Sequence, residues 1–124
     1  IGVDMAIILG DDEKNALLQG AWHIPGSGTP DDTDGYKNIV ISGHRYLYTS
    51  GPNTFFNLDK IQTEDIIQIF WQNQEYKYQV NKIHIVEPNE ISILEDTGQE
   101  KLTLFTCHPV YTTDQRLVIE ALPI

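Results

Sequence analysis

The chain has 124 residues, a size that suits one domain with a single hydrophobic core. Its formal net charge of −10 argues against nucleic acid as a partner, because binding a phosphate backbone needs clustered Lys and Arg. The one cysteine, Cys107, excludes an internal disulfide.

The first third of the chain predicts a strand, a short helix, two loops and a second strand. Residues 3–9 are an apolar run that Gly10 ends, which is typical of a strand. Residues 11–20 carry acids in their first turn and Gly20 at their end, which favours a helix. The Gly- and Pro-rich residues 20–28 and the acidic residues 30–35 predict loops. Residues 38–42 then predict a strand with His44 just beyond its end.

The middle third predicts a loop, a helix and two strands. The polar, Tyr-rich residues 46–53 indicate the loop, and the apolar residues of 54–61 recur at helical spacing. Residues 65–71 predict a strand. Residues 75–86 predict a longer one, whose alternation changes face near Asn81 and so indicates a bulge. Residues 91–94 fit a short strand or a helical turn equally well.

Two strands are expected at the C-terminal end. Residues 101–108 alternate between two faces, and Pro109 cannot donate to a ladder, so the strand should stop there. Cys107 therefore lies where a strand opens into a loop. Nine residues on (116 − 107), Arg116 begins the apolar run 116–122, which predicts the partner strand. Two strands joined by such a loop would bring the thiol and the guanidinium close together.

These elements predict a mostly β fold in one domain, residues 1–124. Seven or so strands with two short helices fit a closed or nearly closed β-barrel with Greek-key-like joins.

Two short motifs resemble those of the sortase family. Residues 103–107, Thr-Leu-Phe-Thr-Cys, followed by Pro109 and by Arg116-Leu117, resemble the family's cysteine signature. Residues 42–45, Ser-Gly-His-Arg, resemble its histidine motif. The resemblance covers residues 3–122, and the spacing from Cys to Arg is closest to that of class C, D and E sortases. It implies a sortase-like β-barrel of about seven to eight strands with short connecting helices.

The chemistry of an acyl transfer explains why these residue types occur together. A lone Cys is most often a small buried hydrophobe, and a free thiol is mostly protonated at neutral pH. A nearby His can form a thiolate–imidazolium pair or protonate the leaving group, and Arg116 can meet the negative charge that develops on oxygen. The alternative for Arg116 is a surface salt bridge with Asp114 or Glu120. Thr106 is expected beside the thiol, in contact with substrate, although it also fits simple strand packing.

Four histidines compete for the role of proton partner. His44 is favoured by its place after a strand and by the resemblance. His84 is expected to face solvent, and His108 should point away from Cys107 because strand neighbours point apart. His23 lies in a predicted loop and could line a cleft. Arg45 is expected to support the structure rather than the catalysis.

No cofactor is expected. Zinc is disfavoured because the chain has neither Cys-x-x-Cys nor His-x-x-x-His spacing. Some sortases bind calcium, and the acidic side chains in comparable loops make calcium a weaker alternative here: Asp31, Asp32, Asp34, Glu87 and Glu90. A solvated acidic surface is the favoured interpretation.

The resemblance implies a cysteine transpeptidase that cleaves a Leu-Pro-x-Thr-Gly-like sorting signal between Thr and Gly. The acyl group would pass to an amine of peptidoglycan or of a pilin. Such an enzyme acts outside the cytoplasm at the bacterial cell surface. Its N-terminal membrane anchor, and a first strand, would be absent from these 124 residues. Two alternatives remain: a hydrolytic cysteine peptidase, and an inactive β-barrel binding module with a structural cysteine.

Overall fold

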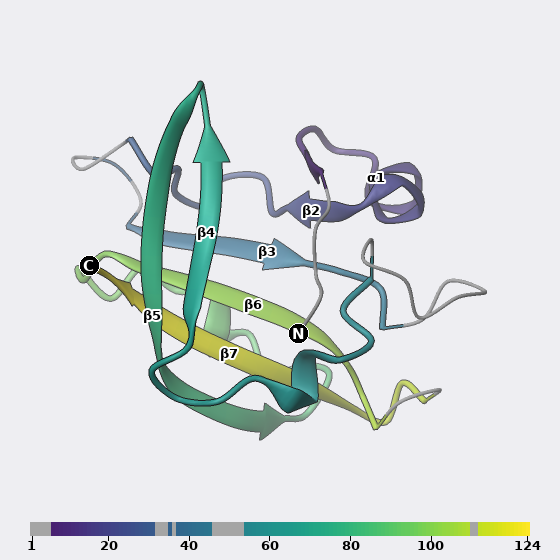
Figure 1. Ribbon diagram of the computed structural model, residues 1–124. Coiled ribbons are helices and arrows are strands. Elements are labelled where there is room, and N and C mark those ends of the chain that lie inside the picture. Colours follow the sequence, from purple (N-terminus) through teal and green to yellow (C-terminus); the bar gives the residue numbers. More distant parts are fainter. Residues whose placement is uncertain (1–5, 32–34, 36, 46–53, 110–111) are drawn as a thin grey trace.

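The computed structural model of the chain describes residues 6–31, 35, 37–45, 54–109 and 112–124 (Figure 1). The predicted mostly β class is confirmed, with seven strands, one α-helix and two 3₁₀ turns in these described residues. The elements are β1 (Ile7–Ile8), α1 (Glu13–Gln19), β2 (Ala21–His23), β3 (Asn38–Ser42), η1 (Leu58–Lys60), β4 (Ile66–Trp71), β5 (Gln74–Val86), η2 (Ser92–Leu94), β6 (Lys101–His108) and β7 (Gln115–Pro123).

All seven strands belong to one sheet, in the order β1-β2-β3-β6-β7-β5-β4. β1 with β2 and β3 with β6 are parallel pairs, and the remaining neighbours are antiparallel. Figure 1 shows β4 and the first part of β5 crossing in front of β3, β6 and β7, so the sheet curls into a half-barrel. The β6–β7 hairpin therefore lies near the middle of the sheet, with paired strands on both sides.

The concave face of the sheet holds the hydrophobic core. Alternate side chains of the central strands meet there, such as Leu102, Leu104, Leu117 and Ile119. Phe55 packs onto them from the connection between β3 and β4. Since successive strand residues point to opposite faces, the other residues of β6, among them Cys107, lie on the outer face.

The outer face is partly covered by the connection between β5 and β6. Asn38 is fully buried, and its side-chain amide donates to the carbonyls of Ile93 at 2.9 Å and Glu95 at 3.1 Å. Thr103 on β6 donates to the Asn38 side-chain oxygen at 2.7 Å. A buried amide with all these partners satisfied fixes the connection against β3 and β6.

Two predictions for the first third of the chain differ from the structure. Of the strand predicted over residues 3–9, only Ile7–Ile8 form a strand, β1, among the described residues 6–9. Residues 3–5 lie outside the described residues. The loop predicted over residues 20–28 was wrong in part, because Ala21–His23 form β2 between β1 and β3. Three residues flanked by Gly20 and Pro25 carry too short a pattern to outweigh those two turn signals.

The predicted helix over residues 54–61 was also wrong. Only Leu58–Lys60 are helical, as one 3₁₀ turn. Its apolar residues Phe55, Leu58 and Ile61 are all buried, as the spacing suggested. A spacing of three residues suits the 3₁₀ turn as well as an α-helix, so the pattern located the buried side chains but not the helix type. The loop predicted over residues 46–53 lies outside the described residues.

Two further predictions concern the edges of the strands. The pairing of β5 with β7 shifts register between Val80 and Lys82, which confirms the bulge near Asn81. Residues 91–94, left open between strand and turn, contain the 3₁₀ turn η2. None of the helices that the structure describes is long and apolar enough to cross a membrane.

Candidate active site

Cys107 and Arg116 lie directly opposite each other on neighbouring strands. They form a register pair of the antiparallel β6–β7 ladder, next to the pair His108 and Gln115. Side chains of such a pair share one face and come within about 5.5 Å at their Cβ atoms. The predicted proximity of thiol and guanidinium thus follows from the register, and Cys107 is half-buried on the outer face.

The β3–β6 register brings His44 to the other side of Cys107. Ser42 pairs with Phe105, and the Gly43 amide continues the parallel ladder by donating to the Phe105 carbonyl at 3.2 Å. β3 ends at Ser42, so His44 lies two residues beyond its end. Counted on in the β3–β6 register, His44 would correspond to Cys107. All three candidate residues are half-buried, and we call His44, Cys107 and Arg116 together the Cys107 row. Cys107 and Arg116 are paired in the β6–β7 ladder, and His44 follows the end of β3, the other neighbour of β6.

The backbone of His44 is held from both sides. Its carbonyl accepts from the Phe55 amide at 2.8 Å, and the Gly43 carbonyl accepts from the Thr106 hydroxyl at 2.7 Å. Gly43 is required here by close approach, because a Cβ at this position would lie 2.6 Å from the Phe55 ring. The motif glycine thus lets the core pack directly beneath the histidine.

Thr106, predicted to contact substrate, lies on the core face beside this glycine. It is 2% exposed, and its hydroxyl donates a hydrogen bond to the Gly43 carbonyl. Its substrate contact stays a prediction, while its observed bond ties the end of β3 to the end of β6.

Arg116 is bonded to backbone rather than to a carboxylate. Its Nη1 donates to the carbonyls of Thr113 at 3.1 Å and Gln115 at 3.0 Å. The alternative was a salt bridge with Asp114 or Glu120, but among the described residues no ion pair to Arg116 occurs. Both of these bonds use Nη1, so the hydrogen bonds seen among the described residues do not involve Nε or Nη2.

The other three histidines have local partners. The Nε2 of His23 lies 2.7 Å from the Gly28 carbonyl and 3.1 Å from the Ser27 hydroxyl, within the connection that follows β2. His84, expected to face solvent, is half-buried and lies 2.9 Å from Glu120. The His108 Nδ1 lies 3.4 Å from Nη1 of Arg45. The rings of His23 and His84 thus lie against groups outside the Cys107 row, and the ring of His108 lies beside the Arg45 guanidinium.

Glu120 is the centre of a separate charged group on the same outer face, the Glu120 cluster. Its carboxylate lies 3.1 Å from Lys101, 3.9 Å from Lys82 and 2.9 Å from His84. Burial alone would raise the pKa of this carboxyl. The hydrogen bond from Lys101 and the charges of Lys101, His84 and Lys82 outweigh burial and lower the pKa below its usual range.

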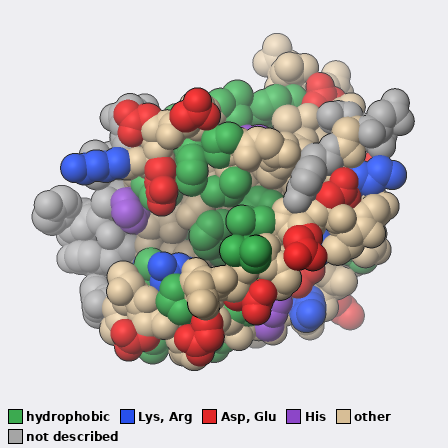
Figure 2. Space-filling view, turned by 180° about the vertical axis from the view of Figure 1, so that it is seen from behind, with side chains coloured by type: hydrophobic (Ala, Val, Ile, Leu, Met, Phe, Trp, Pro, Cys, Tyr) green, Lys and Arg blue, Asp and Glu red, His purple; other side chains and the backbone are tan. Residues whose placement is uncertain are grey.

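The acidic loops considered for calcium do not form a site in the part of the chain that the structure describes. No group of three or more His, Cys, Asp or Glu side chains that could hold a metal occurs there. Asp31 accepts from the Thr29 hydroxyl at 2.9 Å and Glu90 from the Ser92 amide at 3.2 Å. Asp32 and Asp34 lie outside the described residues. Figure 2 shows carboxylates scattered over one face around a central apolar area.

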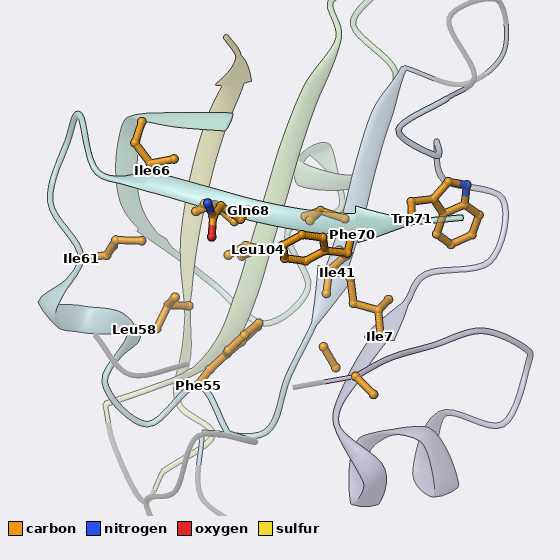
Figure 3. A pocket seen from close by; sticks show the side chains of 14 residues that line it. Ile7, Ile41, Phe55, Leu58, Ile61, Ile66, Gln68, Phe70, Trp71 and Leu104 are labelled. Atoms are coloured by element: carbon orange, nitrogen blue, oxygen red, sulfur yellow. The ribbon is translucent and has the colours of Figure 1, made fainter. Parts of the chain in front are cut away.

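An apolar cavity lies elsewhere in the described part of the chain. A cavity of about 730 Å³ lies between β4 and the concave face, lined by Phe55, Leu58 and Leu104 among other apolar side chains (Figure 3). Trp71 and Ile66 lie at the two ends of β4 in this view. No residue of the Cys107 row lines this hollow. The three candidate residues therefore lie outside this cavity.

Comparison with known proteins gives a consistent match. The family model for the sortase domain matches residues 1–124. Sortase A of Bacillus anthracis is 26% identical over 119 residues, which are 96% of this chain and 53% of that protein. The chain spans about half the length of that protein and of another curated relative, sortase D of Bacillus subtilis, to which it is 28% identical over 110 residues.

Solved structures agree with the sequence match. Sortase C-1 from Actinomyces oris superimposes with a TM-score of 0.86 at 30% identity, over 98% of this chain and 66% of that one. Sortase C of Streptococcus pneumoniae gives a TM-score of 0.84 at 31% identity, over 97% of this chain and 60% of that one. The likeness to solved sortases thus extends over nearly the whole chain.

Proposed function

The chain belongs to the sortase family, whose members are cysteine transpeptidases, and on this premise we propose that it carries the catalytic site of a sorting-signal transpeptidase. Cys107 would be the nucleophile, His44 the proton carrier and Arg116 the donor that stabilises the oxyanion. The observation that supports this assignment best is the pairing of Cys107 with Arg116 across β6 and β7, while His44 follows the end of β3 on the other side of β6.

In the first half of the reaction, the Cys107 thiolate attacks the Thr carbonyl of a Leu-Pro-x-Thr-Gly-like signal. The C=O bond opens to a tetrahedral oxyanion, which an N–H group of Arg116 meets. As the oxyanion collapses, the Thr–Gly C–N bond breaks and imidazolium His44 gives its proton to the leaving Gly amine. A thioester on Cys107 remains, and His44 is neutral.

In the second half, an amine attacks the thioester carbonyl and His44 takes a proton from it. The C–S bond then breaks, so the thiolate and the imidazolium are both restored. An amine of peptidoglycan or of a pilin is the proposed acceptor. The sortase C structure from Streptococcus pneumoniae is described as informative on pilin substrate specificity, which supports a pilin as one acceptor to test here.

The proposed location follows from the family. Sortases are generally surface enzymes held by a membrane anchor, and anchoring proteins to the cell wall is the family's known role. We infer that this domain works outside the cytoplasm, joined to such an anchor. Sortases generally need no cofactor. Calcium dependence stays a hypothesis that chelation during the assay would test.

The test is an assay with a library of fluorogenic sorting-signal peptides, run with and without amine acceptors. We expect cleavage between Thr and Gly, and a ligated product in the presence of an amine. Cleavage that gives only the hydrolysed product, even when an amine acceptor is present, would indicate a hydrolytic peptidase. No cleavage of any peptide, with Cys107 resistant to an alkylating agent until unfolding, would indicate a binding module with a structural cysteine.

A further inference from the structure

Arg45, the residue after His44, is one of the two arginines in a chain of net charge −10 and is almost completely buried. Its side chain is 5% exposed. Burying a guanidinium is costly unless its donors are paired. Among the residues that the structure describes, its one charged partner is Asp59, at 3.3 Å, and that carboxylate is 46% exposed. An exposed carboxylate contributes a weak, solvent-screened attraction, so the ion pair alone does not account for the burial.

Other N–H groups of Arg45 bind two backbone carbonyls and approach one histidine ring. Its Nε donates to the Phe56 carbonyl at 2.8 Å, and its Nη1 donates to the Cys107 carbonyl at 2.9 Å. The same Nη1 lies 3.4 Å from Nδ1 of His108, which must be unprotonated to accept it. The end of β3, the segment before η1 and the end of β6 thus meet at one guanidinium.

The bond to Cys107 takes the place of a rung in the sheet. The Gly43 amide donates to the Phe105 carbonyl, so the next rung of this parallel ladder would join the Arg45 amide to the Cys107 carbonyl. The Arg45 guanidinium donates to that carbonyl instead. The backbone is thereby free to leave the sheet at His44, while the two ends stay joined through a side chain.

We propose that Arg45 is a positioning residue that sets the placement of His44 against Cys107, an inference that rests on the proposed function. His44 lies between the Gly43 bonds to β6 on one side and the Arg45 bond to the nucleophile's own carbonyl on the other. Lysine at this position would keep the charge but has no planar fork to reach Phe56 and Cys107 together. A shift of about 1 Å between reacting groups can cost about a hundredfold in rate.

The experiment compares Arg45→Lys with the wild-type chain and with Asp59→Asn, which removes only the charged partner. For each protein, kcat and KM are measured on the peptide that the wild type cleaves, and the alkylation rate of Cys107 by iodoacetamide is measured without any peptide. Near-UV circular dichroism gives the folded fraction, and trimethylamine oxide is added where needed to keep the variants folded.

We expect Arg45→Lys to lower kcat at least about tenfold per folded molecule, with KM within about twofold. Alkylation should slow severalfold, because the thiolate would then lose the imidazolium that we propose lies beside it. Asp59→Asn should stay near wild type in kcat and in the alkylation rate. The inference is overturned if Arg45→Lys keeps kcat within twofold, if its alkylation rate is unchanged, or if Asp59→Asn loses as much.

The two assays keep this inference separate from the proposed function. If the wild type cleaves no peptide, the proposed function fails, and alkylation alone still reports whether Arg45 holds His44 near the thiol. If the wild type is active and Arg45→Lys matches it, only the role of Arg45 fails.

Discussion

Two charged regions lie on the outer face of β6 and β7, and they are built in opposite ways. In the Glu120 cluster, one carboxylate is surrounded by Lys82, His84 and Lys101. In the Cys107 row, Arg116 is bonded only to carbonyls of its own segment among the described residues. The two regions are four residues apart on β7, about 13 Å along the strand.

On the proposed function, the difference separates charge that stabilises the fold from charge that would be available to a ligand. A carboxylate ringed by cations has little capacity left for another partner. A guanidinium on neutral carbonyls keeps its full charge, which a developing oxyanion can use. If this comparison is right, changes in the Cys107 row should lower activity and spare stability, whereas changes in the Glu120 cluster should do the reverse.

Removing the nucleophile should have the largest effect. We expect Cys107→Ala to lose at least about a thousandfold in kcat, because no other group can form the thioester. Stability should change by less than about 1 kcal/mol, since a half-buried thiol is a small loss at the end of a strand. Acyl-enzyme formation by mass spectrometry and a thermal melt measure the two. Cleavage within about tenfold of wild type would contradict the assignment of Cys107 as nucleophile.

Two histidines on the same face provide the next test. His44→Ala should be nearly as damaging as loss of Cys107, because the leaving amine then lacks its proton donor. His84→Ala is the matched control, since His84 lies in the Glu120 cluster and not in the Cys107 row. We expect it to keep kcat/KM within about threefold and to lose some stability. An essential His84 beside a dispensable His44 would reverse the comparison.

Arg116→Lys tests whether the fork or only the charge is needed. We expect a loss on the order of a hundredfold in acylation rate, as for removal of one oxyanion donor. The thermal melt should be nearly unchanged, because Arg116 has no carboxylate partner among the described residues. Asp114→Asn is the control for the discarded salt bridge and should be near wild type. Near-normal acylation in the Lys variant would indicate that backbone amides, rather than Arg116, stabilise the oxyanion.

The sequence predicted the C-terminal hairpin well because two independent signals agree there. Alternation fixed the faces of β6, and Pro109 fixed its end, so the pairing of Cys107 with Arg116 followed from the loop length. The bulge near Asn81 was predictable for the same reason, since a change of face needs an extra residue.

The contacts of Arg45 and Glu120 could not be predicted, because they join residues far apart in the chain. Arg45 contacts β6 through a bond that spans 62 positions, and Glu120 collects cations from two other strands. Local periodicity carries no information on such pairs. One signal for Arg45 was present: the only two arginines of an acidic chain both lie within the motif segments.

The smallest effect on activity is expected from Glu120→Gln, and it is the clearest test of the stabilising region. The pKa of the folded Glu120 carboxyl is lowered, on balance against burial, by Lys101, His84 and Lys82. Because the pKa is lower in the folded state, the carboxylate stabilises the folded protein fully above the unfolded pKa, about 4.3. This contribution to stability is lost as the pH falls through the folded pKa.

At pH 7, Glu120→Gln should lower the free energy of unfolding by about 2 kcal/mol, since the side chain is 17% exposed and hydrogen-bonded to Lys101. The deficit should shrink below about pH 4 and vanish once the wild-type carboxyl is protonated.

Urea denaturation of both proteins between pH 3 and pH 7 measures this deficit, with Glu75→Gln as the matched control. Glu75 makes a 3.9 Å pair with Lys77 at a surface where both side chains are exposed, so its loss should cost under about 0.5 kcal/mol. The kcat of Glu120→Gln, measured where it is folded, should stay within about twofold of wild type. A Glu120→Gln variant with normal stability and impaired turnover would instead give the Glu120 cluster a role in catalysis. Its charge would then influence Cys107 although Glu120 lies four residues along β7 from Arg116, the residue paired with Cys107.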